Sequence, residues 1–87
     1  MHWEVYTTMP KTPKRLPSDL PQRKVLTAVK RLGFDLDREG GKHSIYKDPD
    51  NPDRIMSIPR HSRIKKQLLQ GILAGAGVSE EQFMDVY

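Results

Sequence analysis

The sequence contains no cysteine, and this absence limits both its chemistry and its location. Without cysteine there is no disulfide framework, no zinc–cysteine site and no thiol nucleophile. No apolar run approaches the ~18 residues that a membrane-spanning helix needs. Residues 1–10 also lack the basic and apolar regions of a signal peptide. We therefore expect a cytoplasmic protein that has no membrane partner.

Side chains that titrate near neutral pH are few. The three histidines, His2, His43 and His61, are the only ones, so acid–base chemistry would run most simply through one of them. His2 lies near the terminus and is expected to be inert. His43 follows a glycine pair in GGKHSIY, and His61 lies in IPRHSR. For each of these two, a purely structural surface role stays open as the alternative.

Acidic residues are absent from positions 54 to 79, although the chain as a whole carries a net charge of only +4. That stretch holds a basic cluster: Arg60, His61, Arg63, Lys65 and Lys66. The cluster precedes or begins a predicted helix, where the helix dipole attracts anions. The pattern therefore indicates a phosphate-binding site, with a solvated basic surface as the alternative.

The 87 residues suffice for one domain, 18–87, preceded by an arm, 1–17. The arm holds three prolines and three basic residues. Its segment HWEVY, residues 2–6, alternates as a short edge strand or a docking segment would. A solvated linker is favoured for the remainder of the arm over a contact with RNA or a partner.

Helical periodicity marks both ends of the domain. SDLPQRKVLTAVKRLGF, residues 18–34, predicts a helix capped by Ser18 or Asp19 and ended by Gly33. A second helix is predicted to follow residue 63 and to end at Gly77. Its expected apolar stripe is Ile64, Leu68, Leu69, Ile72, Leu73 and Ala76. SEEQF, residues 79–83, then predicts a capping box and a last helical turn that docks Phe83.

Alternating residues between the helices predict three antiparallel strands. Gly40 and Gly41 are expected to supply positive φ for the first hairpin, and DPDNPD, residues 48–53, the second connection. A calcium loop that began at Asp48 would need glycine at its sixth position and glutamate at its twelfth, but the sequence has Asp53 and Pro59 there. We therefore expect no metal, and no other cofactor. The predicted fold is α+β, in the order α-β-β-β-α. The three-stranded antiparallel sheet should have both helices packed on one face.

The region around His43 combines features that suit a phosphodiester substrate. Gly41 permits close approach of a phosphate-bearing ligand, and Lys42 adds a cation. A histidine general base could deprotonate a ribose 2′-hydroxyl, which makes a metal-free ribonuclease chemically feasible. Tyr46 could stack a base, although a half-buried strand tyrosine is the commoner role. Alternation groups His43 with Ile45 and Lys47 but leaves open which face of the sheet they occupy.

The segment from residue 18 to residue 83 resembles the HicA (YcfA-like) toxins of HicAB toxin–antitoxin systems. LGF, GGKHSIY and IPRHSRIKKQLLQGILAGAGVSEEQF carry the resemblance. It implies a double-stranded-RNA-binding-domain-like fold, mRNA interferase activity and a HicB-type antitoxin as partner. It also implies that His43 is catalytic. Gly41 matches the glycine of the family's Gly-Ser-His signature, whereas Lys42 replaces the usual serine.

Together these features predict a type II toxin that cleaves single-stranded mRNA without a metal. Single strands are favoured because in-line attack needs backbone freedom that a duplex resists. Two alternatives stay open. One is a non-catalytic nucleic-acid-binding module, and the other is a degenerate toxin that acts only as a protein-interaction partner.

Overall fold

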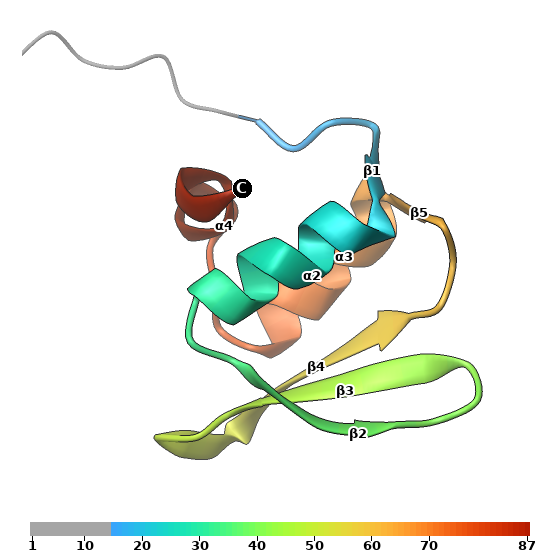
Figure 1. Ribbon diagram of the computed structural model, residues 1–87. Helices are drawn as coiled ribbons and strands as arrows, with labels where there is room; N and C mark the ends of the chain where they lie inside the picture. Colours follow the sequence, from blue (N-terminus) through green and yellow to red (C-terminus); the bar gives the residue numbers. More distant parts are fainter. Residues whose placement is uncertain (1–14) are drawn as a thin grey trace, which may run out of the picture.

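The computed structural model describes residues 15–87. Three helices lie on one side of a three-stranded antiparallel sheet of order β2-β3-β4, and a second sheet pairs two short strands (Figure 1). The elements are β1 (Asp19–Pro21), α2 (Gln22–Arg31), β2 (Asp35–Glu39), β3 (His43–Asp48), β4 (Asn51–Pro59), β5 (Arg63–Lys65), α3 (Lys66–Gly75) and α4 (Glu80–Val86). This confirms the predicted α+β class and the double-stranded-RNA-binding-domain-like order of its main elements.

The edge strand predicted at residues 2–6 lies outside the described residues. Leu16, which falls in the predicted arm, is 4% exposed and belongs to the hydrophobic core. The core therefore begins before the first strand. None of the helices described is long and apolar enough to cross a membrane.

The start of the first helix differs from the prediction. Asp19 does not cap it, because Asp19–Pro21 forms β1 and pairs antiparallel with β5. Pro21 occupies the N-cap position, and no side chain caps this helix. Leu20 lies opposite Ile64 in the ladder, and both are fully buried. The predicted end is confirmed, since Gly33 has φ of 98° after the last turn of α2.

The second predicted helix, α3, begins two residues later than the apolar spacing indicated. Ile64 lies in β5, and the Lys66 N–H donates to the Ser18 carbonyl at 3.0 Å as the helix starts. Leu69 is fully buried, but Leu68 is 45% exposed, so the predicted stripe was too wide. Gly77, with φ of 71°, follows the end of this helix as predicted.

The capping box at the start of α4 is confirmed. Ser79 Oγ accepts from the Gln82 N–H at 3.0 Å, and the Gln82 side chain accepts from the Ser79 N–H at 2.9 Å. Phe83 is fully buried, and its ring stacks on Tyr87 with centroids 5.4 Å apart. The short helix thus closes the core beside α2.

The sheet has one buried and one open face. Ser44 and Tyr46 of β3 lie opposite Ile58 and Met56 of β4, and all four are buried. Alternation places His43, Ile45 and Lys47 on the opposite face, which none of the described helices covers (Figure 1). The structure thereby answers which face of the sheet His43 occupies.

Both hairpin connections differ in detail from those predicted from the sequence. Gly40 and Gly41 do not have positive φ, so that prediction was wrong. The second connection is a tight turn at residues 49–50, in which Asp48 Oδ1 accepts from the Asp50 N–H at 2.9 Å. Asp48 Oδ2 also pairs with Arg54 at 3.0 Å. A strand connection lies here as predicted, but it is shorter than residues 48–53 because Asp48 ends β3 and β4 begins at Asn51.

Candidate active site

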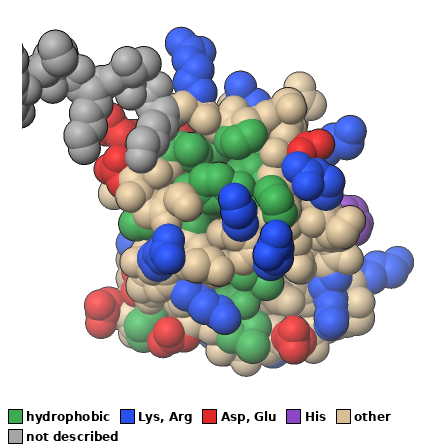
Figure 2. Space-filling view, turned by 45° about the horizontal axis from the view of Figure 1, so that its top comes forward, with side chains coloured by type: hydrophobic (Ala, Val, Ile, Leu, Met, Phe, Trp, Pro, Cys, Tyr) green, Lys and Arg blue, Asp and Glu red, His purple; other side chains and the backbone are tan. Residues whose placement is uncertain are grey.

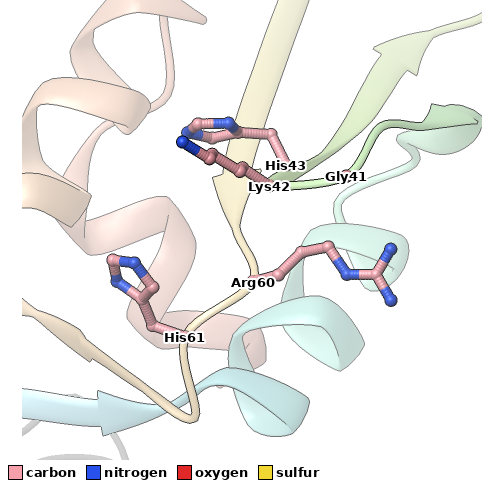
Figure 3. Close-up of a pocket in the computed structure, with 5 residues that line it drawn as sticks. All are labelled: Gly41, Lys42, His43, Arg60 and His61. Carbon is pink, nitrogen blue, oxygen red and sulfur yellow. The ribbon is translucent and has the colours of Figure 1, made fainter.

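An open pocket of about 470 Å³ lies at the end of the sheet away from the residue 49–50 turn. Two chain segments build it, the β2–β3 connection and the link from β4 to β5 (Figure 3). Its lining residues are Gly41, Lys42, His43, Arg60 and His61. The fold thus brings together five of the eight residues assigned to catalysis or phosphate binding from the sequence. Tyr46, which was assigned to base stacking, is not among them.

Backbone hydrogen bonds fix the two segments to each other. His43 lies opposite Pro59 in the β3–β4 ladder, and the Arg60 N–H continues the pairing by donating to the Lys42 carbonyl at 2.8 Å. The Gly40 N–H donates to the His43 carbonyl at 2.8 Å and closes the hairpin. Because these bonds join main-chain atoms, the pocket walls are held independently of the side chains that line them.

Gln22 secures the second wall from the helix side and was not singled out from the sequence. Its side-chain amide donates to the Pro59 carbonyl at 3.3 Å, and its backbone N–H donates to the Ser62 carbonyl at 2.9 Å. The segment that carries Arg60 and His61 is therefore fixed at both ends. A glutamine at a helix start is a weak signal, and only the folded arrangement shows this role.

The polar side chains that line the pocket are basic or imidazole groups and include no carboxylate. Lys42 and His43 project to one side of the strand ends, and Arg60 extends to the other (Figure 3). Arg60 donates one hydrogen bond to the Gly40 carbonyl at 3.2 Å, which leaves other guanidinium N–H groups for a ligand. Within residues 15–87 neither imidazole has a hydrogen-bond or ion-pair partner. Such a surface suits an anionic ligand.

The remainder of the predicted basic cluster lies outside the pocket. Arg63 is in β5 and donates from Nε to Asp19 Oδ1 at 2.9 Å. This hydrogen bond is the main reason that the pKa of Asp19 is lowered from its ordinary value. Lys65 and Lys66 follow at the start of α3. Because Arg63 already has a carboxylate partner, it is less available to a phosphate than Arg60.

Basic side chains extend beyond the pocket. Figure 2 shows Lys and Arg side chains over much of the face in view, with acidic side chains mainly near its margin. The basic character of the protein is therefore not confined to the pocket, which suits long-range attraction of a polyanion.

Tyr46 is not available for base stacking, so that interpretation was wrong. It is 3% exposed, and burial raises the pKa of its phenol. Its ring belongs to the hydrophobic core under the helices. The commoner role, a buried strand tyrosine, is the one found.

No group of three or more histidine, aspartate or glutamate side chains within residues 15–87 is arranged to hold a metal ion. In the β3–β4 connection, the Asp48 carboxylate is engaged instead by the Asp50 N–H and by Arg54. The pocket itself offers two imidazoles and two permanent cations.

The fold and pocket define a small α+β protein of the double-stranded-RNA-binding-domain-like class with a cationic pocket that contains two histidines. A family model described as the HicA toxin of bacterial toxin–antitoxin systems matches residues 23–78, more than half of the chain. The chain therefore belongs to the HicA toxin family, and the matched range includes every residue that lines the pocket. A search of curated proteins found no match.

Proposed function

We propose that this toxin is a metal-independent mRNA endoribonuclease in which His43 is the general base. The observation that supports the proposal is the exposed His43 imidazole in a pocket whose other charged groups, Lys42 and Arg60, are cations. A neutral imidazole takes up a proton near physiological pH, and the cations attract a phosphodiester. Membership of a toxin family gives such an activity a biological role.

In the proposed reaction His43 removes the proton from a ribose 2′-hydroxyl, whose oxygen then attacks the adjacent phosphorus. Lys42 and Arg60 neutralise the negative charge that increases on the phosphoryl oxygens. Gly41 leaves space for the backbone of the substrate, since a Cβ built there meets nothing within 4 Å. Single-stranded mRNA is the proposed substrate, because attack in line with the departing oxygen needs a flexible backbone.

A HicB-type antitoxin is the proposed partner in the cytoplasm. Binding over the pocket would block RNA, and the toxin would act only when the antitoxin is lost. The exposed pocket at the open end of the sheet makes occlusion of His43 the simplest route to inhibition.

The test compares the parent chain with His43→Ala, each expressed alone and then purified. We expect growth arrest and mRNA loss with the parent only, and a 10²- to 10⁴-fold lower cleavage rate for His43→Ala in vitro, the usual contribution of a general base. His2→Ala serves as the matched histidine control and should cleave like the parent. Thermal unfolding of each variant verifies that it is folded.

Undiminished cleavage by folded His43→Ala would refute His43 as the base. A parent that binds RNA with high affinity but does not cleave it would support the non-catalytic binding module. A parent that binds only the antitoxin would identify a degenerate toxin.

A further inference from the structure

His61 is the second imidazole of the pocket, and the sequence assigned it only to phosphate binding. Resting on the proposed ribonuclease activity, we propose that His61 is the general acid that protonates the departing 5′-oxygen. His61 lies after β4 and lines the same pocket as His43, which begins β3. The two rings come from separate chain segments that meet at the strand ends (Figure 3).

RNA cleavage by the 2′-hydroxyl needs two proton transfers. The leaving group is an alkoxide, which is about as basic as hydroxide and departs slowly unless it is protonated as the P–O bond breaks. Lysine and arginine side chains hold their protons too firmly near neutral pH to serve readily as acids. Lys42 and Arg60 therefore serve as fixed charges. Imidazole is the side-chain type suited to proton exchange near neutral pH, and two imidazoles line the pocket.

The step balances with these two groups alone. The 2′-oxygen forms a bond to phosphorus as neutral His43 takes the 2′-hydroxyl proton. The bond from phosphorus to the 5′-oxygen breaks as His61, initially protonated, gives its proton to that oxygen. The products are a 2′,3′-cyclic phosphate and a 5′-hydroxyl. His43 ends protonated and His61 neutral, and exchange with water restores both.

The two rings are carried by chain segments whose backbones are paired with each other. His61 is two positions beyond Pro59, the ladder partner of His43. The bond from the Arg60 N–H to the Lys42 carbonyl ties the segments together between the two rings. Gln22 restrains the His61 segment on both sides. Lys42 projects to the same side as the two rings (Figure 3). A phosphate held there by Lys42 would lie between a base and an acid, as in-line displacement requires.

The decisive test changes the leaving group. His61→Gln is compared with the parent on RNA and on a ribonucleoside 3′-(4-nitrophenyl phosphate). The nucleoside is the one found on the 5′ side of the parent's cleavage site. Nitrophenolate departs without protonation, so it needs no general acid. We expect His61→Gln to lose 10²- to 10⁴-fold on RNA but to stay within about threefold of the parent on the activated ester. His43→Ala should be slow on both substrates.

The pH profile on RNA gives a second readout. A base that must be neutral and an acid that must be protonated produce a bell-shaped profile. His61→Gln should keep the decrease in rate at low pH and lose the decrease at high pH. His61→Lys preserves a cation and should remain slow on RNA if proton transfer is the role of His61.

Three results would overturn the assignment. Equal loss on RNA and on the activated ester would show that His61 binds the phosphate or supports the pocket. Full RNA cleavage by His61→Lys would show that charge alone suffices. A retained alkaline limb in His61→Gln would place the acid elsewhere. These outcomes differ from failure of the proposed function itself, in which the parent cleaves neither substrate.

Discussion

Replacing Gly41 with alanine should separate stability from activity, because the pocket leaves space for the added methyl group. Gly41 does not have positive φ, and a Cβ built there meets no atom within 4 Å. The alanine therefore adds no strain, and it reduces the conformational entropy of the unfolded chain. We expect the free energy of unfolding to stay unchanged or to rise by up to about 0.4–1 kcal/mol.

RNA cleavage should nevertheless decrease. The methyl group would occupy space at the pocket wall that the proposed mechanism gives to the substrate backbone. A displacement of the phosphate by about 1 Å can lower the rate by the order of 100-fold. Urea unfolding and a single-turnover cleavage assay on purified protein would measure the two effects separately.

Two glycines provide matched controls. Gly40 also lacks positive φ, and a Cβ built there would meet only the His43 carbonyl oxygen, at an ordinary 3.5 Å. Unlike Gly41, Gly40 does not line the pocket. Gly40→Ala should therefore preserve both stability and cleavage. Gly33 has φ of 98°, so Gly33→Ala should lose about 1 kcal/mol, the left-handed penalty of roughly 1–2 kcal/mol less the entropic gain. Destabilised Gly41→Ala, or Gly41→Ala that cleaves like the parent, would refute the reasoning.

Two further predictions test the packing and electrostatics. Leu69→Ala should lower the free energy of unfolding by about 2–5 kcal/mol, whereas the adjacent Leu68→Ala should change it by less than about 0.5 kcal/mol, because Leu69 is fully buried and Leu68 is 45% exposed. Equal effects in urea unfolding would contradict the placement of α3. The hydrogen bond from Arg63 lowers the pKa of Asp19 below its ordinary 3.8, so the stability from this group is present above that pH and is lost as the pH falls through the lower, folded-state value. Asp19→Asn should therefore show a shallower loss of stability below about pH 4, and an unchanged acid transition would argue against the pair.

Local sequence signals predicted the features that depend on few residues. Gly33 and Gly77 end helices because the chain needs left-handed φ at those positions, and both have it. The capping box of Ser79 and Gln82 needs only residues three apart, and its two hydrogen bonds form. Such signals are reliable because the physical cause lies within one turn of helix.

The short sheet of β1 and β5 could not be predicted in the same way. Each strand has three residues, and their pairing joins segments more than 40 positions apart, such as Leu20 and Ile64. Ile64 also lies four residues before Leu68, so its spacing imitated the start of a helix. The pairing then displaced the predicted caps, because Asp19 entered the ladder and bonded Arg63 instead.

His43 and His61 line the same pocket because the pairing of β3 with β4 contains a register shift, which the sequence does not predict. Asp48 pairs with Asn51 across the turn, and a regular hairpin continued from that pair would place Met56 opposite His43, each five residues away. The register instead shifts between Lys47 and Asp48, and His43 lies opposite Pro59, three residues further along. At about 3.3 Å per residue the shift amounts to about 10 Å along the strand. It brings His61 to the pocket, whereas in the regular register His61 would lie well past the end of β3. The candidate active site therefore depends on the register of β3 and β4 as much as on the identity of His43.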